Sequence, residues 1–508
     1  MKTGTFVMIC AALYLVACFA LSIYASMKSS KEASRQDFYV ASSSLGSFVL
    51  FLTAMATAFS AFAFMGQLGQ VYNFGGSAIF NFMHYAIFAY PLMFIFGNKL
   101  WYYGKKYGYV TPADFIADRY DTNMPARLLV GLIICVYFSI FYIVIQMKGC
   151  SWAIQEATGM STPAATFMIA IVLAAYVAIG GMRAVAYTDV MQAIFLLVGS
   201  LIIAATMIYL AGGFNPLYTQ ALAVKPDMLQ PKMDILELIT GGLVMAISLP
   251  LWPALWTKYY CAKDLKTCFG IATGCGLGTV IVTVGLPLII ICGLVIAYPN
   301  WPAAKADNLI IRYVLDYTHP IVAAIVVGGL LSAAMSTADS LLLLISSVFT
   351  VDMTEMLPEK YRNKISEKSI VNFGRIMVFV VIAISFWISL RPMGQLVTIG
   401  IQLTYPGYLL AVPVVAGGLW WKKANKYGLT WGLTAGLITI YITTFVNKNP
   451  FHIASGIWGL VVCSIVFIVV SMLTPSTRPE ILQKFGLGGQ QAEGFTNKLS
   501  TTTIKENI

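Results

Sequence analysis

The sequence predicts an all-α, polytopic membrane protein. Of its 508 residues, 59% are hydrophobic and only 10% are charged, whereas a soluble domain carries roughly 25% charged residues. One bilayer crossing needs about 20 mostly apolar residues, and stretches of that kind follow one another along almost the whole chain. Two of them are interrupted by polar residues, glycine or proline, which a simple bundle of membrane helices does not require.

The apolar stretches predict about thirteen transmembrane helices. They cover residues 5–26, 46–72, 76–103, 127–157, 163–180, 186–211, 236–257, 267–297, 319–351, 370–390, 394–420, 428–446 and 452–473. The first is followed by the basic, polar segment "MKSSKEASRQ". This flank favours a retained helix over a cleaved signal peptide.

The basic residues behind the net charge of +11 are concentrated in the predicted loops of one side of the membrane. With the N-terminus outside, 24 of the 32 Lys and Arg residues fall in loops and helix ends on the cytoplasmic side, Lys258 among them. The positive-inside rule predicts this asymmetry. We therefore expect a plasma-membrane protein with a cytoplasmic C-terminus, embedded in the lipid bilayer, and no nucleic-acid binding.

Groups suited to enzymatic or metal chemistry are scarce. The nine cysteines form no CxxC pair and the three histidines lie far apart, so neither a zinc site nor a disulfide framework is predicted. No nucleophile–base pair is recognisable. We expect no enzyme activity, no cofactor and no obligatory protein partner, and a tail at 474–508 that is partly disordered.

The two interrupted spans indicate where a solute could bind. The second span has small and polar residues at its centre, and the seventh carries Pro250 and Pro253. Proline removes a backbone donor and clashes with the preceding turn, so the helix should unwind there. Freed carbonyls are tolerated in a bilayer only where protein buries them or a wet cavity meets them. Two broken spans five helices apart predict two inverted repeats of a transporter; ordinary membrane packing is the alternative.

The segment "SAAMSTADSLLLLISSVFTVDM" at 332–353 is apolar but carries a polar stripe. At about 100° per residue, one helix face collects Ser332, Ser336, Asp339, Ser340, Ser346, Ser347 and Thr350. The adjacent Ser336 and Thr337 offer hard, neutral oxygen atoms, which suit a weakly held alkali cation. Asp339 lies about three turns from the inner end, so it could reach the interface or cap a neighbouring helix.

A second buried acid, Asp189, lies in "RAVAYTDVMQ" early in the sixth span. This span begins on the side where the hydroxyl-bearing helix ends, so Asp189 and Ser340 could lie at comparable depth. The alternative is that Asp189 complements the dipole at a helix N-terminus.

These segments carry a family resemblance. "GGMRAVAYTDVMQAIFLLVG" (180–199) and "SAAMSTADSLLLLISS" (332–347) resemble the two characteristic segments of the sodium/solute symporter family. The resemblance covers nearly the whole chain, including "SLGSFV" before the first broken span and "GQLGQVYNFG" after it.

The resemblance implies a leucine-transporter-type core, an inverted repeat of five plus five helices. An extra helix and cytoplasmic loop would occupy 1–45, the first repeat 46–211 and the second 236–420. Two accessory helices would follow at 428–473.

The resemblance also implies a sodium site. Its ligands would be the backbone carbonyls of Ala56, Phe59 and Ala333 with the hydroxyls of Ser336 and Thr337. A second sodium, present in some members, would be bound here by Asp189 and Ser340 together with Ser336 and Thr337. Proline carriers place an aspartate where this chain has Ala58, which argues against a simple assignment to proline.

The substrate is less readable. "LWYYGKKYGYVTPADFIADRY" (100–120) and "YIVIQMKG" (142–149) resemble the monocarboxylate-permease branch, so a monocarboxylate or an amino acid is expected. The candidate substrate contacts are Thr57, Ser60, Gln67, Tyr142, Gln146, Trp252 and Trp256. Lys148 could neutralise a carboxylate or snorkel toward the outer surface, and the tryptophans could equally be packing residues.

The function expected from these observations is sodium-coupled import of a small organic solute by alternating access. A proton-coupled or uncoupled carrier, with Asp189 or Asp339 carrying the proton, is one alternative. A sensor with a transporter-like domain is another, although the 35-residue tail offers no obvious output module.

Overall fold

The computed structural model describes residues 3–28, 34–228, 230, 232–392 and 394–487. Within these ranges the chain is helical and contains no strand, apart from one isolated bridge between Leu45 and Ala262. The tail beyond 487, part of the segment for which we expect disorder, lies outside the described residues, as do residues 29–33.

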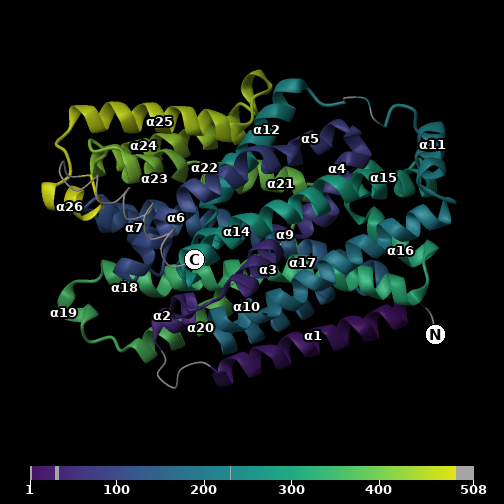
Figure 1. The fold of residues 1–508 in the computed structure, drawn as a ribbon, viewed down its shortest axis with the longest axis horizontal. Helices are drawn as coiled ribbons and strands as arrows, with labels where there is room; N and C mark the ends of the chain where they lie inside the picture. The colour runs from purple at the N-terminus through teal and green to yellow at the C-terminus, as the bar shows by residue number, and fades with distance from the viewer. Residues whose placement is uncertain (1–2, 29–33, 229, 231, 393, 488–508) are drawn as a thin grey trace, which may run out of the picture.

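The first half of the chain holds α1 to α11 with short 3-10 and π-helical segments between them (Figure 1). The elements are α1 (Thr3–Lys28), α2 (Arg35–Val40), η1 (Ala41–Ser43), α3 (Ser47–Ala58), η2 (Phe62–Gly66), α4 (Gln67–Phe74), α5 (Ser77–His84), η3 (Tyr85–Ala89), α6 (Tyr90–Tyr107), α7 (Pro112–Arg119), α8 (Met124–Ala126), η4 (Arg127–Tyr137), α9 (Phe138–Thr158), α10 (Thr162–Leu210) and α11 (Phe214–Val224).

The second half begins with the other interrupted span and ends with the accessory helices. Its elements are α12 (Ile235–Ser248), η5 (Leu249–Leu251), α13 (Pro253–Cys261), α14 (Leu265–Gly278), η6 (Thr279–Gly285), α15 (Leu286–Ala297), η7 (Ala303–Asn308), α16 (Leu309–Tyr317), α17 (Pro320–Ser347), η8 (Val348–Asp352), α18 (Met353–Met356), α19 (Glu359–Arg362), α20 (Glu367–Ser389), α21 (Leu396–Leu403), α22 (Tyr405–Leu409), α23 (Ala411–Trp420), α24 (Lys426–Tyr441), η9 (Ile442–Val446), η10 (Pro450–His452), α25 (Ser455–Leu473) and α26 (Pro479–Lys484).

Eleven helices of the described chain are long and apolar enough to cross a membrane, or twelve if the bent pair α3 and α4 counts as one span. One of the eleven, α10, has 49 residues. At about 1.5 Å per residue it would measure about 74 Å, more than twice the roughly 30 Å of a bilayer core. Two crossings are therefore merged in α10, which accounts for the thirteenth span.

The chain reverses inside α10 at Gly181. On the first part of α10, the carbonyl of Tyr176 accepts a hydrogen bond from Ser22 Oγ at 2.6 Å, near the end of α1. On the second part, Gln192 Nε2 donates to the Tyr14 hydroxyl at 3.1 Å, two turns back along α1. A straight helix would place Gln192 about 24 Å from Tyr176, whereas their partners on α1 are only eight residues, about 12 Å, apart. The helix α10 therefore folds back at Gly181, as the predicted spans 163–180 and 186–211 require.

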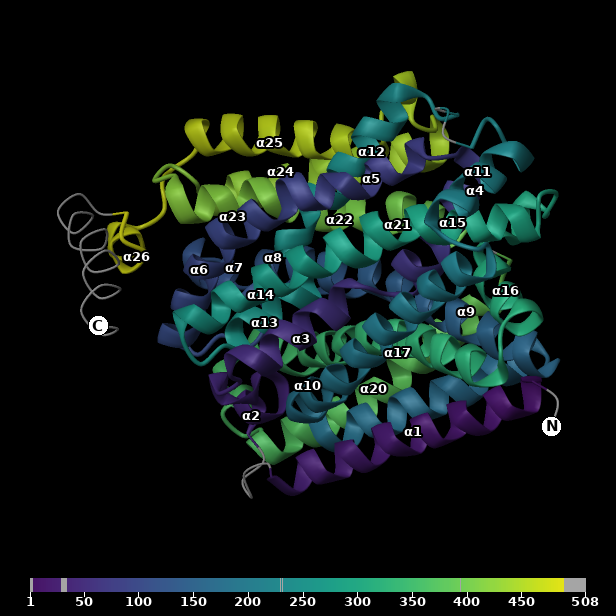
Figure 2. The same cartoon turned by 45° about the vertical axis from the view of Figure 1, so that its right-hand side comes forward.

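The helix with the hydroxyl stripe, α17, lies at the centre of the molecule. In Figures 1 and 2, α17 runs among α3, α9 and α10, while α1 and α25 lie on opposite edges. Of the most apolar window of the α17 span, 83% is buried, compared with 28% for both α1 and α25. The polar stripe thus faces protein, and the two edge helices present apolar side chains outward.

Both interrupted spans unwind near their middle. In the first, α3 stops at Ala58, Phe59 is extended (φ −105°, ψ 109°), and the next helical segment is bent by 53°. In the second, α12 ends in the short η5 turn and Trp252 leaves helical geometry (φ −57°, ψ 121°) immediately before Pro253. Proline thus begins the second half-helix, where its missing N–H is not needed.

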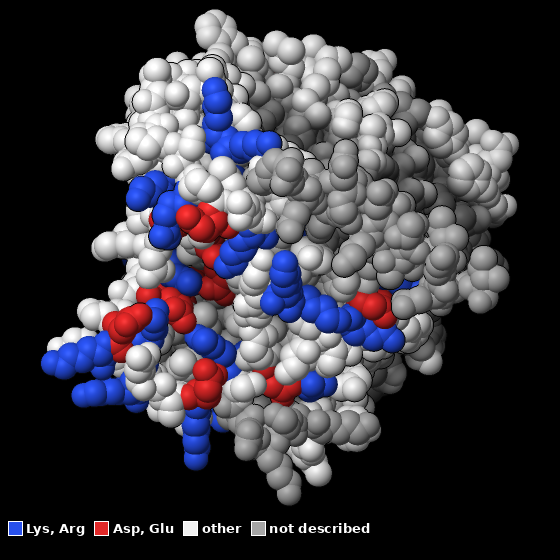
Figure 3. Space-filling view, turned by 60° about the vertical axis from the view of Figure 1, so that its left-hand side comes forward, with Lys and Arg blue, Asp and Glu red and all other residues white. Residues whose placement is uncertain are grey.

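Charged side chains gather at one end of the molecule. Figure 3 shows Lys, Arg, Asp and Glu crowded on the end where α2, α7, α18 and α19 lie. Ion pairs hold these short elements together: Arg35 contacts Glu355 at 3.1 Å and Glu367 at 3.4 Å. By the sequence-based topology this end faces the cytoplasm.

We predict that Gly181→Ala destabilises the protein by about 1–3 kcal/mol. Gly181 has φ +57° and ψ −153°, and an added Cβ would lie 2.6 Å from the backbone oxygen of Phe38. Thermal unfolding of the detergent-solubilised protein measures the effect. Gly270→Ala is the matched control, because its Cβ would meet only Ser47 O at 3.6 Å. An unchanged Tm in Gly181→Ala would contradict the tight reversal.

Candidate cation and substrate site

The break after α3 removes the helical partners of two backbone carbonyls. In a continuous helix, the carbonyls of Ala56 and Thr57 would accept from the N–H groups of Ser60 and Ala61. Instead, the Ala61 N–H donates to Gln146 Oε1 at 2.9 Å. Because these atoms are buried, the two carbonyls need other donors.

Ser336 and Thr337 of α17 supply these donors. Ser336 Oγ donates to the carbonyl of Ala56 at 2.9 Å and lies 3.1 Å from that of Ala333. Thr337 Oγ1 donates to the carbonyl of Thr57 at 2.9 Å and lies 3.3 Å from the carbonyl of Ala333. Three carbonyls and two hydroxyls thus converge where α17 meets the broken helix, a set of hard, neutral oxygens that suits an alkali cation.

Most of the residues that the family resemblance assigns to sodium meet at this junction. Ala56, Ala333, Ser336 and Thr337 are joined by the hydrogen bonds above. Thr57, a predicted substrate contact, also contributes its carbonyl here. Phe59 lies at the break itself, and its N–H donates to the carbonyl of Met55 at 3.2 Å.

Asp189 forms an ion pair that the sequence analysis did not anticipate. Lys258 Nζ, on α13, lies 3.1 Å from Asp189 Oδ2 on α10, and both side chains are completely buried. Lys258 was counted among the basic residues of the cytoplasmic loops and helix ends, but its side chain points into the protein. Thr57 hydrogen-bonds to Asp189 through its side chain, and Thr57 Oγ1 lies 3.3 Å from Ser340 Oγ.

Asp339 also lies inside the protein. Its Oδ2 accepts a hydrogen bond from the Tyr176 hydroxyl at 2.8 Å, and its side chain has no solvent exposure. Asp339 therefore neither reaches an interface nor caps the end of a neighbouring helix.

Two further hydroxyls of the stripe, those of Ser346 and Thr350, contact other elements. Ser346 Oγ donates to the carbonyl of Gly374 on α20 at 2.8 Å. The Tyr39 hydroxyl, from α2, lies 3.2 Å from Ser346 Oγ and 2.7 Å from Thr350 Oγ1. These two hydroxyls of the stripe therefore pack α17 and η8 against α2 and α20 rather than against the broken helix.

An aromatic cluster lies beside the break in the first span. The Tyr142 hydroxyl is 3.3 Å from Ser60 Oγ and 3.1 Å from the Tyr405 hydroxyl. The Tyr142 ring centroid lies 5.1 Å from that of Trp252, and the Phe62 centroid lies 5.6 Å from that of Tyr405. The cluster therefore joins both interrupted spans to α9 and α22.

A small cavity borders this aromatic cluster. Its volume is only about 10 Å³, which is about the room that one water molecule occupies. The lining includes Ala58, Phe59, Phe62, Phe82, Tyr90, Thr279, Thr283 and Tyr405. The structure thus represents a closed arrangement of this region.

The predicted substrate residues fall into two groups. The first group lies in or beside the aromatic cluster and consists of Ser60, Tyr142, Gln146 and Trp252. Gln67 adjoins the cavity, because it donates to the backbone oxygen of Thr283, a residue of the cavity lining.

Trp256 and Lys148 lie outside the cluster. Trp256 Nε1 donates to the Tyr260 hydroxyl at 2.8 Å, in agreement with the packing alternative. Lys148 Nζ donates to the carbonyl of Arg391 at 2.9 Å.

Sequence reasoning missed Phe62, Tyr405 and Lys258. Tyr405 lies in "TYPGYLL", where Pro406 and Gly407 separate α21 from α23, so an interrupted tenth core helix could have marked it. Lys258 stands within an otherwise apolar and aromatic half-span, a position where an ionisable residue indicates a buried partner.

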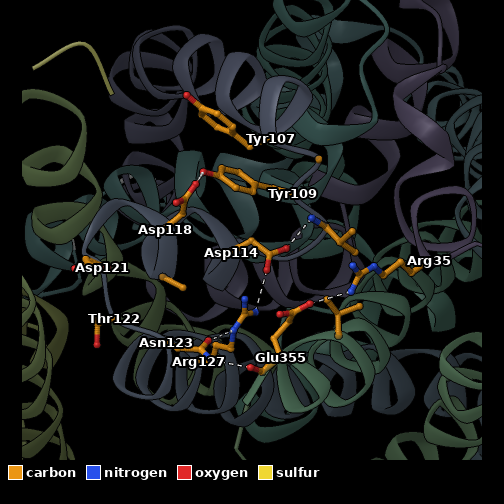
Figure 4. Close-up of a pocket in the computed structure, with 14 residues that line it drawn as sticks. Arg35, Tyr107, Tyr109, Asp114, Asp118, Asp121, Thr122, Asn123, Arg127 and Glu355 are labelled. Atoms are coloured by element: carbon orange, nitrogen blue, oxygen red, sulfur yellow. Dashed lines mark hydrogen bonds and ion pairs between the residues drawn. The ribbon is translucent and has the colours of Figure 1, made fainter. Parts of the chain in front are cut away.

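A larger cavity lies elsewhere, at the charged end. It measures about 430 Å³ and is lined by residues of α2, α7, η4 and α18 (Figure 4). Arg127 crosses it to Asp114 at 2.9 Å and also pairs with the buried Asp352. These contacts tie structural elements together, and the oxygen junction at Ser336 is not part of this cavity.

Asp307, on η7, packs between α4, the second half of the first broken span, and the start of α21. Asp307 Oδ2 accepts from the Leu396 N–H at 2.8 Å, where α21 begins. The carboxylate packs so closely against α4 that a Cβ on Gly69 would lie 2.1 Å from Asp307 Oδ1. Burial raises the pKa of the Asp307 carboxyl from its usual 3.8 to about 7, and the Leu396 N–H offsets only part of this rise.

The chain is similar to known sodium-coupled symporters along most of its length. The model of the sodium:solute symporter family matches residues 38–436. The sodium/pantothenate symporter of Haemophilus influenzae is 25% identical over 91% of this chain and 95% of its own length. The osmoregulated proline transporter OpuE of Bacillus subtilis is 25% identical over 94% and 96%, and the sodium/proline symporter of Staphylococcus aureus is 26% identical over 92% and 93%.

Solved structures support the fold. A substrate-bound, outward-open sodium-coupled sialic acid symporter superimposes with a TM-score of 0.79 at 17% identity, over 93% of this chain and 98% of that one. A nucleobase-cation-symport-1 family transporter in a closed conformation gives 0.59 at 13% identity, over 91% and 97%. The all-α, leucine-transporter-type fold predicted from the sequence is confirmed, while the limits drawn for the two repeats stay a prediction.

We predict that the stability of the protein falls as the pH rises from about 4 to above 7, through the raised pKa of Asp307. Between these values the folded state holds a proton that the unfolded state releases, so the stabilising contribution is complete below pH 3.8 and is lost above about pH 7. Asp307→Asn, which keeps an acceptor for Leu396, should show a flatter Tm–pH profile.

Asp316→Asn is the control for this measurement, because Asp316 is an exposed acid on the neighbouring α16 that pairs with Arg312. It should keep the wild-type profile. Identical profiles for the wild type and Asp307→Asn would contradict the role given to Asp307.

Proposed function

This chain belongs to the sodium:solute symporter family, and we propose that it imports a small organic solute together with sodium by alternating access. The observation that carries this proposal is the junction of α17 with the broken α3. There the carbonyls of Ala56, Thr57 and Ala333 meet the hydroxyls of Ser336 and Thr337. The Phe59 carbonyl, at the break, would complete the set of ligands.

The junction can respond to sodium because a hydroxyl is both a donor and an acceptor. Without an ion, Ser336 and Thr337 donate to the freed carbonyls. With an ion, their protons turn away and the same oxygens become ligands. Sodium therefore links α17 to the broken helix directly and favours one arrangement of the two.

Sodium and solute are coupled through this arrangement. An ion that favours the outward-open shape raises the affinity for solute by typically 1–3 kcal/mol, and the solute raises the affinity for sodium equally. The membrane potential attracts the cation inward at about 2.3 kcal/mol per 100 mV. Sodium is therefore released on the inside, and the solute follows.

A monocarboxylate or an amino acid is the substrate class that we favour. The relatives include symporters named for pantothenate and proline, both of which are small carboxylates. The indole of Trp252 is buried beside Tyr142 in the aromatic cluster, and its N–H could donate to a carboxylate oxygen of the solute. The cavity has Ala58 in its lining, where proline carriers have an aspartate, which within this class favours a monocarboxylate over proline.

We place the protein in the plasma membrane with the N-terminus outside and the C-terminus in the cytoplasm. The charged end in Figure 3 carries α2, α7, α18 and α19, which are the elements that the positive-inside rule assigns to the cytoplasm. The apolar outer surfaces of α1 and α25 would then face lipid.

We predict that the double substitution Ser336→Ala and Thr337→Ala reduces sodium-stimulated uptake on the order of 5–150-fold, the range of a coupling of 1–3 kcal/mol. The reason is the loss of two oxygens at the junction. Uptake of radiolabelled carboxylates and amino acids into proteoliposomes, with and without a sodium gradient, measures the effect.

Ser347→Ala is the matched control, because Ser347 lies on the same helix but donates to the carbonyl of Leu344 in its own helix at 2.6 Å. It should keep sodium stimulation. Normal sodium-stimulated uptake in the double variant, or wild-type uptake driven by a pH gradient in sodium-free buffer, would refute the proposed function.

A further inference from the structure

A fixed positive charge lies beside the proposed sodium site. Lys258 Nζ, on the second half-helix α13, is 3.1 Å from Asp189 Oδ2 on α10, and neither side chain has any solvent exposure. A charge at this depth is costly unless it is paired. The two residues come from different halves of the chain, so the contact forms only in the folded protein.

Thr57 connects this pair to the sodium junction. Its side chain hydrogen-bonds to Asp189, its Oγ1 lies 3.3 Å from Ser340 Oγ on α17, and its carbonyl accepts the hydroxyl of Thr337. Asp189 and Ser340 are the side chains for which the family resemblance implies a second sodium. The ammonium group of Lys258 contacts one of them directly.

An ammonium group and a sodium ion compete for the same carboxylate. Each carries one positive charge, and each needs oxygen atoms in close contact once water is excluded. At this distance from Asp189, a bound sodium ion would repel the ammonium of Lys258, and burial strengthens that repulsion. The single negative charge of Asp189 is balanced by one cation, and here that cation is the side chain of Lys258, which is covalently part of the chain.

We infer that Lys258 is a tethered cation that replaces the second sodium, so that this chain exchanges one sodium ion per transport cycle. The inference rests on the proposed function and concerns the stoichiometry of the same site. Because the ammonium group never leaves the protein, it contributes no energy from the sodium gradient. Solute accumulation then draws on the gradient of the single ion at Ser336 and Thr337.

Sodium titration of uptake tests this inference, because the Hill coefficient cannot exceed the number of coupled sites. The wild type should give a hyperbolic curve with a Hill coefficient of about 1. In Lys258→Ala, Asp189 loses its resident cation and becomes free to bind sodium. The curve should become sigmoidal, with a coefficient that approaches about 2.

Two lysine variants serve as controls. Lys258→Arg keeps a positive charge near Asp189 and should keep the hyperbolic curve. In Lys148→Ala, the substitution removes another buried lysine, whose ammonium donates to the backbone carbonyl of Arg391, and the Hill coefficient should stay at about 1.

Binding of radioactive sodium to the purified wild-type protein provides a measurement that does not depend on the folding of any variant. We expect one sodium ion per chain at saturation. Two ions per chain, a sigmoidal wild-type curve, or a hyperbolic curve in a folded Lys258→Ala variant would overturn the inference while leaving sodium symport intact. A wild type that shows no response to sodium would instead refute the proposed function.

Discussion

The structure depends on how the membrane interior satisfies the backbone of a broken helix. Where α3 stops, the carbonyls of Ala56 and Thr57 lose their helical partners, and no bulk water is available to replace them. Ser336 and Thr337 donate to both. Without these hydroxyls, the break would leave unsatisfied acceptors in the core, so the position of α17 and the interruption of α3 require each other.

The same junction explains why a stripe of hydroxyls runs along an apolar helix. Its central members face the broken span, whereas Ser346 and Thr350, nearer the charged end, contact Tyr39 and α20. A serine in a membrane helix can thus serve an ion or the packing of a neighbour. Helical periodicity places all of these side chains on one face, but it cannot tell which neighbour each will meet.

Much of the fold could be predicted because bilayer physics acts on local sequence. Hydropathy marks the spans, and Pro250 and Pro253 mark the second interruption. The sequence predicts two separate spans where the structure has α10. The tight turn between them depends on the positive φ of Gly181, which composition does not reveal. Ser336 and Thr337 could be singled out because two adjacent hydroxyls stand out in an apolar helix.

The ion pair and the aromatic cluster could not be predicted in the same way, because their members are brought together only by tertiary structure. Lys258 is 69 residues from Asp189, and Tyr142 is 263 residues from Tyr405. A lysine near the end of a span looks like a cytoplasmic anchor until the orientation of the half-helix is known. The rule that explains basic residues in loops therefore misassigned the one basic residue that pairs with Asp189.

The two junctions of the core differ in chemistry, and that difference determines which of them can release its cation. At the first, neutral carbonyls and hydroxyls satisfy one another when no ion is present, so an ion can leave without exposing a buried charge. At the second, Asp189 carries a formal charge in a fully buried position, and losing its cation would leave that charge uncompensated. A reversible ion belongs at the neutral junction and a permanent one at the charged junction. Placing the permanent charge on α13 also joins the second broken span to the first half of the chain, so the pair serves the architecture as well as the charge balance.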